Sequence, residues 1–280
     1  MLSPQGTELL LRLLSGARVR LSAAEIDGRA VWIKRFDAER RPMAKVLHAL
    51  LSPLLPSFLR SSPAANAAGL AAREARKSAA FRAAGLPTPA IVHRGGAVLV
   101  LSNVSEIVEP TLHRLHDSDA AAHDALLVEM AAALGRVHAA RLCHGRPHPR
   151  DMFRGVEGWG FLDFEEEPEA SMPLEVAQAR DVWLAFMQIA SRAMHEGTND
   201  RAFAAWQAEA PAEIVPQLRR IVSFTAFFLP LLRLLRPIGL GKDGRRLLDG
   251  TTFLRAALED TGQAAAAACK PKPDQIRTPT

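Results

Sequence analysis

The chain has 280 residues, of which 48% are apolar and 23% are charged, a balance that is ordinary for a globular protein with a buried core. Its two cysteines, Cys143 and Cys269, lie far apart in the sequence, which argues against a disulfide scaffold and favours a reducing cytoplasm. The net charge of +5 favours anionic partners such as nucleotides, acidic lipids or nucleic acid.

The first 36 residues predict three short strands, with turns at Ser15-Gly16 and Asp27-Gly28. We expect the strands over residues 8–14, 19–24 and 30–36. The third strand places Lys34 near the end of a β-branched and aromatic run. Taken alone, such a lysine is better explained as an exposed residue at a sheet edge. No glycine-rich phosphate loop precedes it.

Residues 37–70 form a basic insertion in which prolines interrupt two apolar pieces. The interval could lie on an anionic membrane, or its charges could form an ordinary solvated face. Nucleic acid is not an expected partner, because Phe58 and Phe81 are the only aromatic residues available here for base stacking. The basic residues between positions 41 and 105 are Arg41, Lys45, Arg60, Arg73, Arg76, Lys77, Arg82 and Arg94.

A helix is expected over residues 64–84, and Gly85 and Pro87 end it. Its single carboxylate, Glu74, is the only acidic residue of this interval that could pair with a lysine of the preceding sheet. The alternative is an intrahelical pair with Lys77, which would contribute only about 0.2–0.5 kcal/mol.

A second hairpin is predicted from residues 90–92 and 97–101, and a connecting hinge follows at 102–104. Residues 120–140 then predict a helix with an apolar stripe at helical spacing. Such a stripe indicates core packing and not a functional site. The stripe consists of Leu127, Met130, Leu134 and Val137.

The stretch 138–165 predicts a helix end, a polar loop, a tight β-hairpin and an acid that follows an apolar strand. The hairpin strands are expected at 152–154 and 159–162. Because one acid lies at each outer end of this hairpin, Asp151 and Asp163 are predicted to lie close together. Two adjacent carboxylates beside basic residues can hold a divalent cation against phosphate oxygens.

The loop His144-Gly145-Arg146 and the motif Asp163-Phe164-Glu165 resemble the catalytic loop and the metal-binding segment of the protein-kinase-like superfamily. The similarity is greatest to its small bacterial branches, among them the kinases that phosphorylate sugars of the lipopolysaccharide core. The order of motifs matches over residues 7–195, and the last third of the chain matches only as generic helices.

The resemblance implies a bilobal α+β fold. The N-lobe would cover residues 1–104 and contain a five-stranded sheet, one main helix and the basic insertion. A mostly helical C-lobe with the catalytic loop would cover 105–261, and a disordered tail would cover 262–280.

The same resemblance implies where ATP would bind. Lys34, paired with Glu74, would contact the phosphates of ATP. The hinge backbone at Asn103 and Val104 would meet the adenine.

The resemblance also implies a metal site and an ordered loop. Asp163 and Asp151 would hold Mg²⁺, and Glu165 could add to that site. His144 would order the loop backbone, and Asp181, on a helix expected over 174–193, would accept hydrogen bonds from it.

At one position the sequence departs from the family pattern. Arg146 stands where related kinases carry the catalytic aspartate, two residues after the loop histidine, and Asp151 replaces the usual asparagine. A guanidinium at this place could stabilise charge on the transferred phosphate. The base would then be absent, or Asp151 or His148 would serve.

Several functions stay open on the sequence alone. The favoured one is an ATP-dependent phosphotransferase acting on a hydroxyl of a sugar or lipopolysaccharide core, with a protein acceptor second. The first alternative is a catalytically impaired pseudokinase that acts as a nucleotide-binding regulator or a membrane-associated scaffold. The last is a helical membrane-surface protein. The expected location is the cytoplasm, with peripheral contact at the inner membrane open, and residues 224–235 could form a packing surface or a membrane-facing edge.

Overall fold

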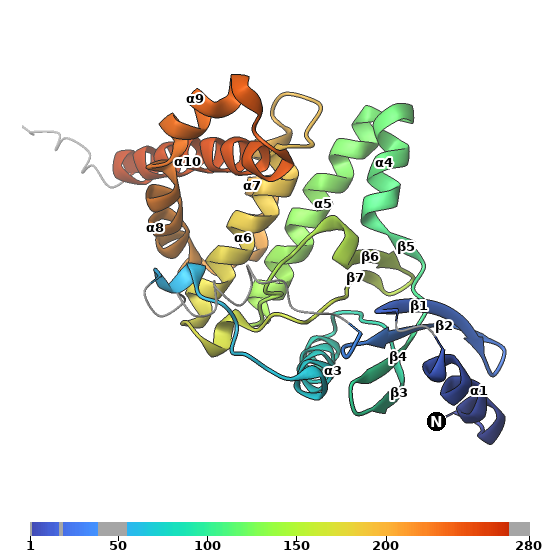
Figure 1. The fold of residues 1–280 in the computed structure, drawn as a ribbon. Coiled ribbons are helices and arrows are strands. Elements are labelled where there is room, and N and C mark those ends of the chain that lie inside the picture. Colours follow the sequence, from blue (N-terminus) through green and yellow to red (C-terminus); the bar gives the residue numbers. More distant parts are fainter. Residues whose placement is uncertain (1, 17–18, 39–54, 269–280) are drawn as a thin grey trace, which may run out of the picture.

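The computed structural model of the chain describes residues 2–16, 19–38 and 55–268, with side chains described through residue 260. These residues form a bilobal α+β structure (Figure 1). A small lobe is built on an antiparallel sheet, and a larger lobe is mostly helical. This is the fold class that the sequence predicts.

The small lobe contains the strands β1 (Leu21–Ile26), β2 (Arg29–Arg35), β3 (Ile91–Gly95) and β4 (Val98–Ser102). They form an antiparallel sheet in the order β1-β2-β4-β3. Asp27 and Gly28 have φ angles of 52° and 69°, and two central residues with positive φ are what the tight turn between β1 and β2 requires. Lys34 pairs with Leu21 on one side and Leu99 on the other, so it lies on an inner strand and not at a sheet edge.

The predicted strand over residues 8–14 is wrong, because this segment is the helix α1 (Pro4–Ser15). Ser3 caps the helix by accepting a hydrogen bond from the backbone N–H of Gly6, and a proline occupies the first helical position. Leu10 and Leu14, four residues apart, pack against the sheet. The sheet therefore has four strands among the described residues, and not the five that were predicted.

The main helix of the small lobe is α3 (Ala67–Ala83), as the sequence predicts. Asn66 begins it by accepting a hydrogen bond from the backbone N–H of Gly69. A short 3₁₀ turn, η2 (Ser57–Leu59), precedes α3. Residues 39–54, about half of the predicted basic insertion, lie outside the described residues.

The helical lobe begins with a small three-stranded sheet, in the order β5-β6-β7. The hairpin of β6 and β7 and the long helices α5 and α6 form where the sequence predicts them. The elements are β5 (Glu106–Ile107), α4 (Val108–Ser118), α5 (Ala120–Ala139), η3 (Pro149–Asp151), β6 (Met152–Gly155), β7 (Gly158–Phe161), η4 (Pro168–Ala170), α6 (Leu174–Ala190), α7 (Thr198–Glu209), α8 (Ile214–Ala226), α9 (Leu229–Gly239) and α10 (Lys242–Ala268).

The core of this lobe runs through α5, α6, α7, α8 and α10 and buries the predicted stripe of α5. Trp206 at its centre is fully buried and donates a hydrogen bond from Nε1 to Nδ1 of His138 at 3.1 Å. His138 is therefore a structural histidine with a satisfied partner on one side.

The chain end differs from the prediction in one respect. Helix α10 continues to Ala268, so disorder does not begin at residue 262. The helix ends in a run of alanines, and alanine has the highest intrinsic helix propensity of all residue types. Residues 269–280, including Cys269, lie outside the described residues.

Candidate active site

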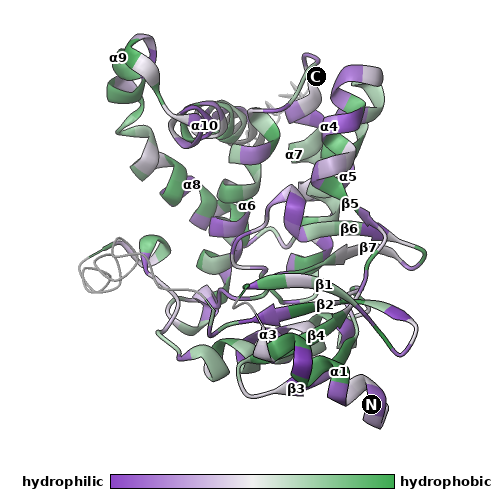
Figure 2. Cartoon of the chain, turned by 45° about the vertical axis from the view of Figure 1, so that its right-hand side comes forward, coloured by the Kyte–Doolittle hydropathy of each residue, from purple (hydrophilic) through white to green (hydrophobic). Residues whose placement is uncertain are grey.

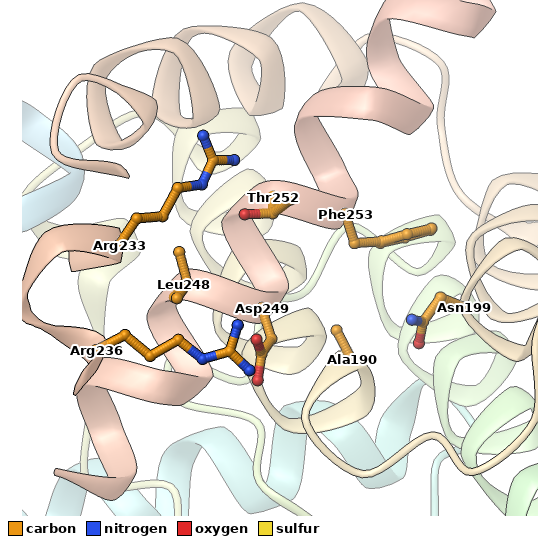
Figure 3. A pocket seen from close by; sticks show the side chains of 8 residues that line it. All are labelled: Ala190, Asn199, Arg233, Arg236, Leu248, Asp249, Thr252 and Phe253. Carbon is orange, nitrogen blue, oxygen red and sulfur yellow. The ribbon is translucent and has the colours of Figure 1, made fainter. Parts of the chain in front are cut away.

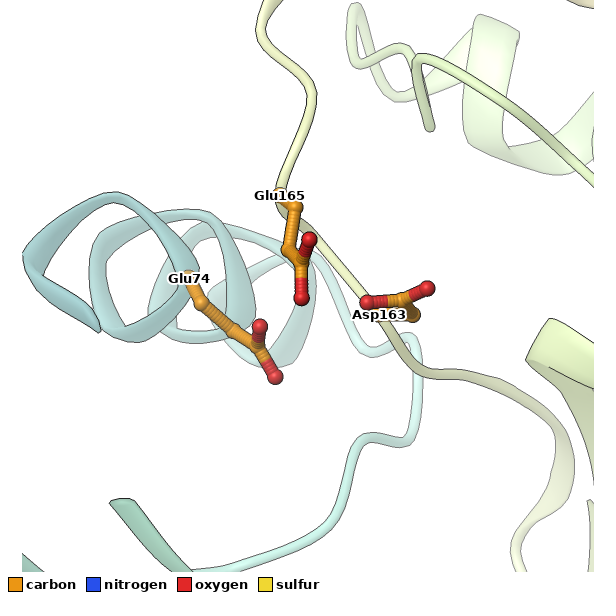
Figure 4. A group of neighbouring side chains, drawn as sticks. All are labelled: Glu74, Asp163 and Glu165. Atoms are coloured by element: carbon orange, nitrogen blue, oxygen red, sulfur yellow. The ribbon is translucent and has the colours of Figure 1, made fainter. Parts of the chain in front are cut away.

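Lys34 extends from β2 into a group of three carboxylates that come from both lobes. Its Nζ lies 2.6 Å from Oε2 of Glu74, 2.6 Å from Oδ1 of Asp163 and 2.9 Å from Oε1 of Glu165. Helix α3 supplies Glu74 and the segment after β7 supplies the other two, and the three carboxylates point toward one another (Figure 4). Lys34 and Glu74 are buried, so this pair forms in place of the intrahelical pair with Lys77.

The ion group contains more negative charge than one ammonium neutralises. Burial would lower the pKa of Lys34, but Glu74, Asp163 and Glu165 raise it above the ordinary lysine value. Burial raises the pKa of Glu74 to about 7, against the opposing attraction of Lys34. Burial also favours the neutral form of Asp163, yet Lys34 and Arg146 hold its pKa well below the usual range, so Asp163 is ionised at neutral pH.

Asp163 has a left-handed backbone, with a φ of 62°. Aspartate tolerates this region better than a β-branched residue does, because its short polar side chain meets less steric hindrance there. This conformation occurs two residues after the apolar end of β7, and the side chain of Asp163 itself contacts Lys34. Such conformations persist where surrounding contacts hold them, commonly at functional sites.

Asp181 on α6 holds the polar loop that precedes β6. Its carboxylate accepts hydrogen bonds from the backbone N–H of His144 at 2.6 Å and of Gly145 at 2.9 Å. Gly145 has a φ of 103°, and a Cβ there would lie 2.9 Å from the carbonyl oxygen of Glu166, so glycine is required. Nε2 of His144 lies 2.9 Å from the carbonyl oxygen of Leu162 and joins the loop to the residue just before Asp163. These contacts are those that the resemblance implies for His144 and Asp181.

Aromatic packing also holds the segment after Asp163 in place. The ring of Phe164 lies 4.6 Å from that of Phe81 on α3 and 5.3 Å from that of His144, measured between centroids. All three side chains are buried. Burial lowers the pKa of His144, so the ring is neutral and packs as part of the core.

Asp151 presents a carboxylate oxygen without a partner. Its Oδ2 is buried and accepts no hydrogen bond from any described residue, while Oδ1 lies 3.5 Å from Nε of Arg150. Burial, and next the charge of Asp163, raise the pKa of Asp151 to about 7. The backbone N–H of Leu162 donates to the carbonyl oxygen of Asp151 at 2.9 Å and keeps the two ends of the hairpin together. An orphaned carboxylate oxygen beside an ionised acid fits a divalent cation such as Mg²⁺.

Glu165 lies beside Asp163, and its role as a further metal ligand stays a prediction. Candidate ligand atoms of Glu74, Asp163 and Glu165 lie within 4.8 Å of one another, but the ammonium group of Lys34 lies among them. Glu165 is also ion-paired with Arg20 from the start of the sheet. Asp151 lies outside this group. Because its Oδ2 has no partner among the described residues and Asp163 is ionised, these two carboxylates are the ones that fit a metal.

Arg146 lies beside Asp163, and the predicted hinge residues, Asn103 and Val104, follow the end of β4. Arg146 has a side chain that is 43% exposed, and its Nη2 lies 3.5 Å from Oδ2 of Asp163. The backbone N–H of Asn103 donates to the carbonyl oxygen of Ala30 at 3.2 Å, and its side chain accepts a hydrogen bond from Trp32. The Asn103 N–H is therefore engaged in the sheet, and Val104 beside it is half-buried.

Sequence reasoning missed the cations that hold α3 against the segment after Asp163. Nζ of Lys77 lies 2.8 Å from Oε1 of Glu169 and donates to the carbonyl oxygen of Glu166 at 2.9 Å. Arg73 lies 3.2 Å from Glu167 and donates to the carbonyl oxygen of Glu165 at 3.0 Å. The acidic run 165–169 and the basic helix were both visible in the sequence, and their opposite charges were the signal that could have paired them.

The same contacts show where part of the basic helix finds its partners. Arg73, Arg76 and Lys77 pair with acids of this protein, and Arg73 and Lys77 are buried, while the side chain of Arg76 is 59% exposed. Arg73 and Lys77 are therefore not part of a solvated face, and contact of the other basic residues with an anionic membrane stays a prediction.

No protein-family model matches the sequence, and a search of curated proteins gave no match. Among solved structures, the chain is similar to a MAP kinase from Leishmania major in complex with a ligand. The two chains are 15% identical, the similarity covers 91% of this chain and 87% of the other, and the TM-score is 0.35. At this level the similarity assigns neither an activity nor a branch of the superfamily.

Proposed function

We propose that the protein is an ATP-dependent phosphotransferase. The observation that carries the proposal is the position of Lys34, whose ammonium lies 2.6 Å from both Glu74 and Asp163 and so joins the two lobes around one site. An ammonium group beside an ionised acid and an orphaned carboxylate oxygen, that of Asp151, is a suitable arrangement for the phosphates of a nucleotide and a divalent cation.

Phosphoryl transfer depends mainly on positioning and on charge neutralisation. Lys34 would bind phosphate oxygens, and Asp163 and Asp151 would hold Mg²⁺, which when bound neutralises charge on those oxygens. Arg146 beside Asp163 would stabilise negative charge on the transferred group. Asp181 and His144 keep the loop that carries Arg146 in place.

Between the two residues considered as a base, the electrostatics favour Asp151. Burial and nearby arginines lower the pKa of His148 to about 3, which makes its imidazole a weak base. Burial raises the pKa of Asp151 to about 7, so Asp151 would be matched to proton transfer near neutral pH when its carboxylate does not hold Mg²⁺.

The favoured acceptor is a hydroxyl of a sugar or of the lipopolysaccharide core. Four arginine side chains are close enough to His148 to depress its pKa, and His148 is joined to Asp151 by a 2.8 Å backbone hydrogen bond. Positive charge next to the proposed base supports an acceptor that itself carries phosphate or carboxylate groups, as acidic and phosphorylated sugars do. The four residues are Arg146, Arg150, Arg192 and Arg246.

The test is transfer of phosphate from ATP to such acceptors by the purified protein. We expect Asp163→Ala and the isosteric Asp163→Asn to lower kcat by about a hundredfold or more, because each removes the ionised acid at the metal site. Asp117→Asn, a change at an acid that is 88% exposed, is the matched control and should leave kcat unchanged. Full turnover by either Asp163 variant would show that the proposed mechanism is wrong.

A second candidate is a nucleotide-binding regulator without transferase activity. The observation that favours it is Arg146, which takes the place of the catalytic aspartate and contacts Asp163 directly. A regulator of this kind would bind ATP and transfer no phosphate to any sugar acceptor.

A further inference from the structure

Helix α9 is amphipathic, but its apolar face points outward, whereas a surface helix usually turns its apolar face toward the core. Its leucine and isoleucine positions recur at helical spacing on one face, and this face is turned outward. Leu234 is 71% exposed and Ile238 is 83% exposed. Only Leu229 of the whole helix is buried. The outward face consists of Leu231, Leu234, Leu235 and Ile238.

The bend between α8 and α9 adds aromatic side chains to this surface. Phe227 is 80% exposed, and Phe224 and Phe228 are each more than one third exposed. Helix α8 packs its other face into the core through residues such as Leu218 and Ile221. Phe224 also contacts the ring of Phe58, with centroids 5.5 Å apart, so Phe227 is the most exposed of the three rings. In Figure 2, α8 and α9 appear as largely hydrophobic helices at the outer side of the helical lobe. We call residues 224–238 the apolar elbow.

Within the segment that forms the apolar elbow, all charged residues have one sign. Residues 214–242 contain five basic residues and no aspartate or glutamate, and the acids nearest to them, Asp249 and Glu259, belong to α10. A partner that covers exposed leucine and phenylalanine and at the same time meets an excess of positive charge is a surface of anionic lipid. The five residues are Arg219, Arg220, Arg233, Arg236 and Lys242.

The arginines of α9 lie on the opposite face from its leucines. Arg233 and Arg236 extend toward α10 and line a cavity of about 420 Å³ between α9 and the rest of the lobe (Figure 3). Asp249 is the only acid among the residues that line this cavity. Two guanidinium groups behind an apolar face are placed to bind headgroup phosphates at the level of the lipid–water boundary.

The dimensions of the elbow indicate contact in the plane of a membrane. Among the described residues, no single helix is long and apolar enough to cross a bilayer. Helices α8 and α9 pass such a test only together, and they are bent by 55° relative to each other. Two short, bent helices with one apolar side have the shape of an interfacial anchor.

We propose that the apolar elbow binds to the surface of an anionic phospholipid bilayer, with its Phe and Leu side chains in the acyl boundary and Arg233 and Arg236 on headgroup phosphates. This surface is separate from the cleft around Lys34, so the proposal does not depend on the proposed activity.

The first experiment uses the full-length wild-type protein and sedimentation with vesicles. We expect the protein to bind vesicles of phosphatidylcholine mixed with phosphatidylglycerol, to bind phosphatidylcholine alone weakly, and to be released as salt is raised, because the headgroup attraction is screened. Failure of the wild-type protein to bind the anionic vesicles overturns the proposal. Equal binding to both kinds of vesicle overturns the assignment of the arginines.

Two double variants separate the apolar and the charged contributions. We expect Phe227→Ser with Leu234→Ser to abolish binding, and Arg233→Gln with Arg236→Gln to weaken partitioning into anionic vesicles by about thirtyfold. The matched controls are Val156→Ser, at a fully exposed apolar residue in the β6–β7 turn, and Arg29→Gln with Arg94→Gln on the small sheet, and both should bind as wild type does.

The competing occupant is a second copy of the chain. Sedimentation velocity without vesicles tests it with the same proteins. If the wild-type protein forms a dimer that the Phe227 and Leu234 variant lacks, and vesicles leave the wild-type protein in solution, a second copy covers the elbow and the membrane proposal is overturned.

Discussion

Arg146 places a second positive charge on the acid that would bind the metal. Asp163 receives Lys34 on Oδ1 at 2.6 Å and Arg146 on Oδ2 at 3.5 Å. A divalent cation on Asp163 therefore has to compete with a guanidinium group. The side chain of Arg146 is partly exposed, so it can leave Asp163 at little cost and bind a negatively charged group in the cleft.

This dual role predicts the kinetics of Arg146→Gln. We expect kcat to fall by about tenfold to a hundredfold, because charge on the transferred group loses its partner, while the Mg²⁺ concentration needed for half-maximal rate decreases. Steady-state kinetics over a magnesium titration measure both quantities. Arg146→Lys should restore only part of kcat, because an ammonium group lacks the planar bidentate geometry of guanidinium. An unchanged kcat in Arg146→Gln would assign the residue to neither role.

At the scale of secondary structure elements, Asp124 joins α5 to the segment that begins α7. It is 1% exposed and accepts hydrogen bonds from the backbone N–H of Met194 at 3.0 Å and of His195 at 2.7 Å, and from Oγ1 of Thr198 at 2.8 Å. Burial alone would raise its pKa, but these bonds and that of His123 hold the pKa of Asp124 well below the usual range. The charged form is thus the one that the fold stabilises.

The sign of the pH dependence follows from that shift. A carboxyl whose pKa is lowered by folding stabilises the protein above its unfolded pKa of about 4, and this contribution is lost as the pH falls toward the folded value. We expect Asp124→Asn to lower the free energy of unfolding by about 2–3 kcal/mol at neutral pH, and the difference from wild type to shrink at about pH 3. Urea unfolding at the two pH values measures it. Asp243→Asn, with a side chain that is 94% exposed, is the control.

The sequence predicted those elements that carry local signals. The β6–β7 hairpin and the helices around it have clear turn residues and apolar periodicity, and their bounds agree with the structure within a few residues. The predicted strand over residues 8–14 was wrong because a short run of leucines fits a strand as well as a helix, while the cap at Ser3 and Pro4 decides for a helix.

In the site, the order of the motifs was enough to predict that Lys34, Glu74 and Asp163 lie together, and Lys34 contacts both acids in the structure. The position of Glu165 was not predictable in this way. It depends on Arg20, which precedes β1 and has no motif around it, and on the register with which the two lobes meet. Contacts between residues 145 positions apart leave no local pattern in a sequence.

At the scale of the whole molecule, the site around Lys34 joins residues of both lobes, as does the core cluster in which Phe81 of α3 packs with Phe164. A ligand that binds residues of both lobes should therefore stabilise the entire protein. We expect ATP with magnesium at a hundredfold excess over Kd to raise the free energy of unfolding by about 2.7 kcal/mol, visible as a higher Tm.

The same thermal-shift titration separates the two candidate functions from a protein with no nucleotide site. Lys34→Met should abolish the shift, and Arg29→Gln, an exposed change on the same strand, should retain it. A wild-type protein whose Tm does not respond to ATP, with or without magnesium, would contradict both the transferase and the regulator.

Rotating α3 away from the cleft would remove Glu74 from Lys34, and it would separate Lys77 from Glu169 and Arg73 from Glu167 in the same movement. Lys77 is only 5% exposed, so an intermediate in which its ammonium has lost these partners inside the protein would be several kcal/mol less stable. The Lys34–Glu74 pair is therefore assembled together with these two contacts in the structure of the chain alone.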